Sequence, residues 1–162
     1  GGAWVSQDIL HTRIHEGEMF EACHYAVTVA NNGTVLLTMQ KGGISMPHLL
    51  YDVATGGNAT FRLIEGGTIT GGTALAAYNY NRSSTAMASG TVLHSGTLAG
   101  GTVIKHRFIP GGSGGTKQGG DVRSSNEVVG LTSLDYTAEV VNISGGSVPV
   151  SIGVSWYEED ED

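Results

Sequence analysis

Residues 20–40 read FEACHYAVTVANNGTVLLTMQ, two apolar runs separated by Asn32-Gly33. β-branched, aliphatic and aromatic residues dominate both runs, and these residue types fit the pleated surface of a sheet. Asn-Gly is a dipeptide favoured in tight type I′ turns, because both of its residues tolerate positive φ. The stretch therefore predicts a β-hairpin with strands at Phe20–Ala30 and Thr34–Gln40.

The rest of the chain repeats this pattern of short apolar runs and turn residues. Gly makes up 26 of the 162 residues, and it enters the positive-φ conformations of tight turns without steric cost. No segment carries the apolar stripe of an amphipathic helix. Further strands are expected at Ser45–Ala54, Ala59–Glu65, Leu75–Tyr80, Ala88–Ser95, Val103–Ile109, Asn126–Gly130, Tyr136–Ile143 and Val148–Tyr157. About ten strands at this spacing predict an all-β, single-domain antiparallel sandwich over residues 18–157, and this number favours a jelly-roll-like arrangement.

An extended N-terminal arm, residues 1–17, is expected to precede the sandwich. It shows neither the alternation of a strand nor the stripe of a helix, and its apolar residues are Trp4, Val5, Ile9, Leu10 and Ile14. An apolar segment without a period of its own gains stability by packing against another element. The arm is therefore expected to lie either across a neighbouring subunit or over an edge strand of its own domain.

Acidic residues are concentrated in a C-terminal tail. Residues 158–162 hold five of the fifteen Asp and Glu residues, and without them ten acids face eight Lys and Arg. The body is therefore nearly neutral and lacks a basic stripe, so no nucleic-acid partner is expected. No apolar run approaches the roughly 20 residues of a membrane span, and the first residues lack the regions of a signal peptide. Neither a membrane partner nor an export signal is expected.

Residues that carry catalysis or bind metals are sparse and scattered. His11 and His15 have the i, i+4 spacing of a metal pair, but this spacing makes a site only on a helix, and the arm offers no helical cap. The other histidines lie on separate expected strands, without a His-x-His pair. Cys23 lies in an alternating apolar run and is expected to be a small buried side chain rather than a nucleophile. Because a Gly-x-Ser-x-Gly motif is also missing, the residues by themselves favour neither a serine hydrolase nor a metal site.

Four short motifs follow one another along the chain: IHEGEMF (residues 14–20), YNYNR (78–82), GGDVR (119–123) and WYE (156–158). Their order, together with the chain length, resembles small structural proteins of tailed-bacteriophage virions, in particular capsid decoration (cement) proteins. The resemblance covers most of the chain, although the glycine-rich residues 110–120 and the acidic tail depart from it. It implies a protein without catalysis or cofactor that binds the major capsid protein on the outer capsid surface of the virion. It also implies a homotrimer, because many decoration proteins cluster about local threefold axes.

Two groups of residues are candidates for the contacts of such a protein. The capsid or subunit interface is expected in the arm, at Trp4, Val5, Ile9, Leu10, Ile14 and His15. A structural turn or subunit contact is expected at Asn79, Asn81 and Arg82, because Asn tolerates left-handed turns and Arg can bridge carbonyls or a carboxylate. Arg123 and Glu127 are expected to pair within the fold or between subunits.

Two other classes of function stay open at this stage. A glycan- or host-surface-binding module of a virion would use Tyr78, Tyr80 and the glycine-rich segment, since an aromatic ring offers an apolar face and a polar tip. A hydrolase on the same sandwich would need paired carboxylates, for which the expected strands offer Asp52, Glu65, Glu127 and Glu139.

Overall fold

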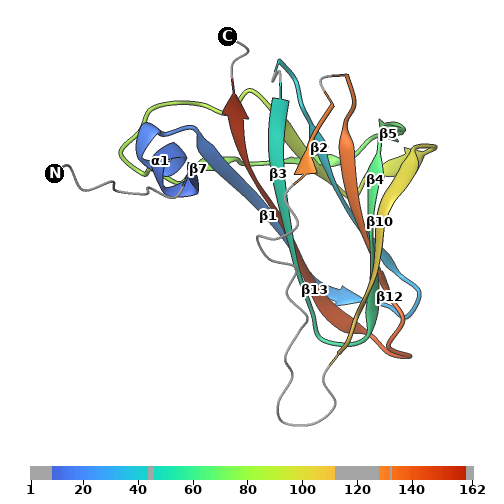
Figure 1. The fold of residues 1–162 in the computed structure, drawn as a ribbon. Coiled ribbons are helices and arrows are strands. Elements are labelled where there is room, and N and C mark those ends of the chain that lie inside the picture. The colour runs from blue at the N-terminus through green and yellow to red at the C-terminus, as the bar shows by residue number, and fades with distance from the viewer. Residues whose placement is uncertain (1–8, 44–45, 112–127, 132, 160–162) are drawn as a thin grey trace, which may run out of the picture.

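A computed structural model describes residues 9–43, 46–111, 128–131 and 133–159 of the chain. The fold is an all-β sandwich of antiparallel sheets packed against each other, with a short helix, α1 (Ile9–Glu16), beside one end (Figure 1). The first sheet contains, in spatial order, β11 (Val128–Val129), β3 (Met46–Thr55), β13 (Val148–Glu159), β1 (Met19–Val29) and β7 (Tyr78–Asn79). The second sheet contains, in spatial order, β10 (Thr102–Ile109), β4 (Ala59–Glu65), β12 (Tyr136–Asn142), β2 (Thr34–Gln40), β8 (Thr91–His94) and β6 (Thr73–Leu75). A separate ribbon consists of β5 (Thr68–Thr70) and β9 (Thr97–Ala99).

Long central strands hold each sheet together. In the first sheet β13 pairs with β3 on one side and with β1 on the other, where Trp156 lies opposite Phe20. In the second sheet β12 pairs with β2 and β4, and Ala138 lies between Leu37 and Leu63. All of these side chains are buried. The register therefore brings apolar residues of neighbouring strands into contact on the same face.

The core lies between the two sheets and comes mainly from alternate residues of their long central strands. In β12, Tyr136, Ala138 and Val140 are buried, and Glu139 between them is only half-buried. Thr137 is buried as well, and its hydroxyl lies 2.8 Å from the hydroxyl of Thr38 in a hydrogen bond. The largest fully buried side chains are Trp156, Tyr136, Phe61, Leu37, Met39 and Leu49. The period-two pattern that predicts the strands is thus the pattern that fills the core.

The expected hairpin at Asn32-Gly33 is wrong, although the chain does turn there. β1 and β2 lie in different sheets and do not pair with each other. Asn32 has a φ of 63°, but Gly33 lacks the positive φ of a type I′ turn. The turn is instead bound to Asn142 at the end of β12, by hydrogen bonds from Asn32 N to Asn142 O (2.7 Å) and from Asn142 N to Gly33 O (3.0 Å). Asn-Gly specifies a turn but not the strand partners, which depend on where each apolar face is buried.

Residues 9–16 form a helix, so the expectation of an arm without helical structure is wrong for this part. The segment lacks a broad apolar stripe, and accordingly none of the side chains of α1 is fully buried. Gly17, with a φ of 78°, ends the helix: Gly17 N donates to Ile14 O (3.1 Å), and Glu18 N donates to Arg13 O (3.0 Å). This pair of bonds is the Schellman motif, in which a glycine just past the last turn satisfies free carbonyls.

Three smaller expectations also differ from the structure. Leu75–Tyr80 is not one strand, because β6 belongs to the second sheet and β7 to the first. The short strands β5 and β9 were not expected, since glycines with positive φ flank them closely in the sequence. Cys23 is exposed rather than buried, because the alternation of β1 places it between buried Ala22 and half-buried His24, on the opposite face.

Candidate functional site

The end of β1 that follows α1 joins three segments that are far apart in the sequence (Figure 1). Asn79 Nδ2 donates to Gly17 O at 2.6 Å, and Asn81 Nδ2 donates to His15 O at 3.0 Å. β7 also pairs with the first residues of β1. The YNYNR motif therefore binds the C-terminal end of α1 to the sandwich. We call residues 13–21, 78–84 and 156–158 together the α1 junction.

Aromatic side chains form the base of the α1 junction. The rings of Phe20 and Trp156 are buried, and their centroids lie 5.8 Å apart. Above the neighbouring Tyr157 ring, the guanidinium of Arg13 lies 5.6 Å from the centroid, and it forms an ion pair with Glu18. Arg13 therefore connects α1 to the last strand through a cation–π contact as well as a charge pair.

Asparagine side chains organise the turn that follows β7. Asn79 Oδ1 accepts a hydrogen bond from Asn81 N at 2.8 Å, and Asn81 Oδ1 accepts one from Ser83 N at 3.1 Å. These are successive Asx turns, in which a side chain replaces the backbone carbonyl of a turn. Arg82 lies over the ring of Tyr78, with its guanidinium carbon 5.4 Å from the centroid.

Beyond the α1 junction, β1 becomes an edge strand. Its pairing with β7 covers only Phe20 and Glu21, whereas its pairing with β13 continues along the strand. Over residues 22–29, which we call the open edge, no strand within the described part of the chain lies on the other side of β1. The pairing of β2 with β8 covers only residues 37–40, so among the described strands residues 34–36 have no neighbour on that side. Such edges present backbone N–H and C=O groups that can pair with another chain.

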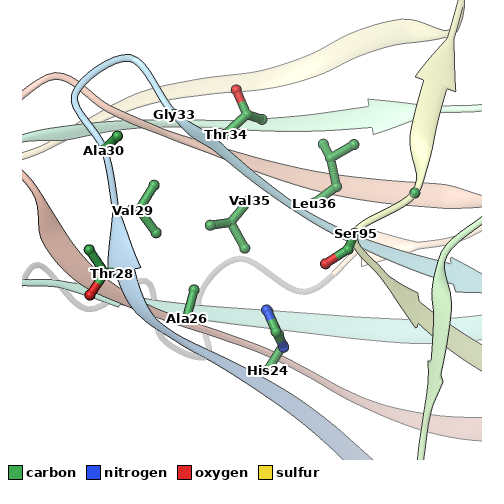
Figure 2. Close-up of a pocket in the computed structure, with 11 residues that line it drawn as sticks. His24, Ala26, Thr28, Val29, Ala30, Gly33, Thr34, Val35, Leu36 and Ser95 are labelled. Carbon is green, nitrogen blue, oxygen red and sulfur yellow. The ribbon is translucent and has the colours of Figure 1, made fainter.

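A groove of about 480 Å³ is lined by residues of β1 and β2 along these edges. Figure 2 shows His24 and Ala26 on β1, Val35 and Leu36 on β2, and Ser95 near one end of the groove. Apolar side chains thus lie beside backbone groups that have no strand partner among the residues that the structure describes. An extended segment bound here would gain both main-chain hydrogen bonds and apolar contacts.

Two histidines from opposite sheets meet at the same groove. The rings of His24 and His94 stack with centroids 3.9 Å apart and an interplanar angle of 16°. His94 Nδ1 also lies 2.7 Å from Ser95 Oγ in a hydrogen bond. Burial lowers the pKa of His24, and the neighbouring His94 lowers it further. Both effects favour the neutral imidazole at this position.

The outer face of β1 is apolar and exposed. Tyr25 is 61% exposed and Val27 is 68% exposed. Nearby, Cys23 Sγ donates a hydrogen bond to Glu21 Oε1 at 3.2 Å. Partial burial of the sulfur, followed by the hydrogen bond and charge of Glu21, raises the pKa of Cys23 to about 12. The thiol therefore stays protonated at neutral pH and is a poor nucleophile.

The residues expected at interfaces fall into three groups. Four lie outside the residues that the structure describes: Trp4, Val5, Arg123 and Glu127. On α1, Ile9 and His15 are exposed, whereas Leu10 and Ile14 are half-buried. All four of these residues lie on α1, and Ile14 and His15 belong to the α1 junction. The third group, Asn79, Asn81 and Arg82, belongs to the turn described above.

Two of the four carboxylates that a hydrolase would need, Glu139 and Glu65, are engaged in other contacts, and Glu127 lies outside the described residues. Glu139 accepts hydrogen bonds from Arg62 Nε at 2.7 Å and Arg62 Nη2 at 2.6 Å. Glu65 accepts one from the Tyr136 hydroxyl at 2.7 Å. Within the described ranges there is no group of three or more His, Cys, Asp or Glu residues that could hold a metal ion. In the same ranges, no helix has the length and apolar character that crossing a membrane requires.

No family model matches this chain, and no curated protein matches it. The functional residues that sequence reasoning missed are those that come together only in the fold. The open edge and its groove leave no local signal, because strand pairing joins distant residues. The helix did leave one, since Gly17 follows Arg13 and His15, and basic residues before a glycine are typical of a helix C-terminus.

Proposed function

We propose that this chain is a non-enzymatic structural protein of a tailed-phage virion, a capsid decoration (cement) protein that binds the major capsid protein on the outer surface of the head. The α1 junction carries the proposal. Three of the four motifs on which the resemblance rests, residues 14–20, 78–82 and 156–158, meet there. The fourth, residues 119–123, lies outside the described residues. The convergence of three distant segments supports their interpretation as one structural unit rather than as chance matches.

We also propose the jelly roll as the finer description of the sandwich. Successive strands β1, β2, β3 and β4 alternate between the sheets, and β13 and β12 return between them. The resulting orders, β1-β13-β3-β11 and β2-β12-β4-β10, are compatible with the two Greek keys of that architecture.

The open edge supports the proposal that this chain is part of a larger assembly. Natural proteins protect long edge strands with charges, proline, β-bulges or a covering element, and the open edge has one irregularity of this kind, in its pairing with β13 between Ala26 and Val29. Residues 22–29 contain no Asp, Glu, Lys, Arg or Pro, and they expose Tyr25 and Val27 beside the unpaired edge. We propose that a second copy of this chain covers the edge on the capsid. A closed ring such as a homotrimer would cover the edge of every copy by the same contact.

Binding to phage heads tests the proposed function. The purified chain is mixed with heads of the phage that encodes it, prepared without this protein, and the heads are sedimented. We expect saturable co-sedimentation, and cryo-electron microscopy should place the added density on the outer surface as trimers. A chain that stays in the supernatant at every concentration would refute the decoration function. Isolated single copies on the head would refute only the trimer.

The arm is tested separately from the edge. With residues 9–16 docked on their own domain, the expected arm contact is left to Trp4 and Val5. We expect the double variant Trp4→Ala/Val5→Ala to keep the melting temperature and to lose affinity for heads. Unchanged binding by this variant would exclude the arm as the capsid contact.

A glycan-binding role is the second candidate, and one feature favours it. Tyr78 is 59% exposed and forms a wall of a shallow groove of about 280 Å³ together with Glu21 and Leu75. Arg82 lies over the ring of Tyr78. A sugar could contact the ring and accept a hydrogen bond from the guanidinium. A glycan array with the wild-type chain and Tyr78→Ala tests this role. A signal that is lost in Tyr78→Ala supports glycan binding, and the absence of a signal from the wild-type chain contradicts it.

A further inference from the structure

We propose that His11 and His15 form a binding site for a first-row divalent transition-metal ion on the exposed face of α1. The sequence argument against such a site required that the arm lacks a helix, and α1 removes that premise. His11 and His15 are one helical turn apart, and their Nε2 atoms lie 3.1 Å from each other. Two histidines at i and i+4 on one helix face are a known arrangement for binding zinc.

The distance between the two nitrogens fits a shared ion. Metal–imidazole bonds are about 2.0–2.1 Å long, so two nitrogens on one ion are roughly 2.9 Å apart at a right angle and roughly 3.4 Å apart at a tetrahedral angle. The observed 3.1 Å lies between these values. The ring planes are inclined at 72°, and both side chains are exposed, so solvent can fill the remaining coordination positions.

Without metal, the same distance is that of a hydrogen bond between two neutral imidazoles, in which one Nε2 carries the proton. Binding of the ion requires this ring to hold its proton on Nδ1, so that both Nε2 lone pairs are directed at the metal. No proton is released when both rings are neutral.

The α1 junction holds the end of α1 that carries His15 in place, and His11 lies one turn before it on the same helix. Asn81 Nδ2 binds the carbonyl of His15, and Asn79 Nδ2 binds that of Gly17. Both bonds fix the end of the helix on which His15 lies. Arg13, the cation between the two histidines in sequence, is paired with Glu18 and lies over Tyr157. Its charge is therefore compensated within the junction.

The neighbouring chemistry defines the class of ion. Imidazole nitrogens suit Ni²⁺, Cu²⁺ and Zn²⁺, whereas Mg²⁺ and Ca²⁺ prefer oxygen ligands. The described residues contain no third His, Cys, Asp or Glu in this group, so the site has two protein ligands there and is open to water. By contrast, His24 and His94 stack nearly parallel, which does not direct their in-plane lone pairs at a common point.

Titration of the untagged chain with NiCl₂ tests the site, in a buffer without metal-binding groups at neutral pH. Calorimetry should give binding of one ion, and NMR should show paramagnetic broadening centred on residues 9–18 and 79–81. We expect His11→Gln and His15→Gln each to weaken binding at least about tenfold, since loss of a mere supporting contact already costs about 10–100-fold. Gln is a good helix former, so α1 should persist in both variants.

His106→Gln is the matched control, because His106 is exposed on β10, outside the α1 junction. It should bind Ni²⁺ as wild type does, and MgCl₂ should produce no heat with any variant. The proposal is overturned if His11→Gln and His15→Gln bind as tightly as wild type, or if His106→Gln loses as much affinity as they do. Unchanged melting temperatures exclude unfolding as the cause of lost binding. This test does not depend on the proposed capsid function.

Discussion

The two halves of β1 differ in their neighbours. Residues 19–21 have α1 packed beside them, and β13 and β7 lie on their two sides. Among residues 22–29, Ala22–Ala26 and Val29 pair with β13, the pairing is irregular between Ala26 and Val29, and the other side is the open edge. Among the described residues, one continuous strand therefore has strand neighbours on both sides at its start, but on only one side at its end. The difference separates residues 19–21, which are held by contacts within the chain, from residues 22–29, whose free side can pair with another strand.

The chemistry of the two halves follows the same division. In the enclosed half, side-chain amides satisfy the carbonyls of Gly17 and His15, and aromatic rings are buried beneath them. In the open half, Tyr25 and Val27 are exposed, and apolar groove walls lie beside free backbone groups. We therefore expect substitutions in the first half to change stability and substitutions in the second half to change association.

Truncation of Trp156 should have the largest effect on stability. Its side chain is fully buried opposite Phe20, and removal of a buried Trp leaves a large cavity. We expect Trp156→Ala to lower the free energy of unfolding by about 3–5 kcal/mol in urea denaturation. The matched change in the open half, Tyr25→Ala, should stay within about 0.5 kcal/mol. Equal losses in the two variants would contradict the division of β1.

Removal of the Asn79 side chain should have the second largest effect on stability. Asn79→Ala leaves the carbonyl of Gly17 without its partner in a buried position, and this costs about 1–3 kcal/mol. Asn81→Ala removes an exposed bond to His15 O, so we expect a loss of about 0.5–1.5 kcal/mol. Thermal and urea unfolding of both variants measure the difference. A larger loss in Asn81→Ala would show that burial does not decide the strength of this junction.

His24 should make stability depend on pH. Its pKa is lowered in the folded state from the ordinary value of 6.5, so the unfolded chain binds more protons below that pH. Stability is therefore expected to be highest above pH 6.5 and to fall as the pH decreases through this value. Melting temperatures measured across this range should fall less steeply for His24→Gln than for wild type. An unchanged slope in His24→Gln would contradict the assignment.

Val27 should have the smallest effect on stability. Its side chain is 68% exposed on the open half, so we expect Val27→Lys to change the free energy of unfolding by less than about 0.5 kcal/mol. A charge beside an open edge opposes pairing with another strand, so trimers on heads should be lost. Ile143→Lys, an exposed position outside β1, is the control. Trimers that survive Val27→Lys would move the proposed contact away from the open edge.

The strands were predictable because their signals are local. The expected strand Ala59–Glu65 matches β4, and Tyr136–Ile143 and Val148–Tyr157 differ from β12 and β13 by one or two residues at an end. In each, alternation places apolar residues on the core face. The turn at Asn32-Gly33 was predictable for the same reason. Its interpretation as a hairpin failed, because pairing depends on segments outside the turn.

The candidate sites were predictable only in part. Asn79 and Asn81 stood out as turn formers, but nothing near them in the sequence indicates that they bind the end of α1. His11 and His15 have the spacing of a metal pair, but this spacing makes a site only on a helix, which the apolar pattern of residues 9–16 does not predict. That helix buries none of its side chains fully, so it lacks the apolar period by which a helix is recognised.

By itself, the sequence determined that this chain is all-β, where most of its strands and turns lie, and which faces of the strands are apolar. These properties follow from backbone sterics and from a period of two, which act over a few neighbouring residues. Only the tertiary structure decided that β1 and β2 belong to different sheets, that one side of β1 stays open, and that α1 meets residues 79–81. These features depend on the apolar surface that residues dozens of positions apart bury against one another. No local pattern encodes the total area that they bury.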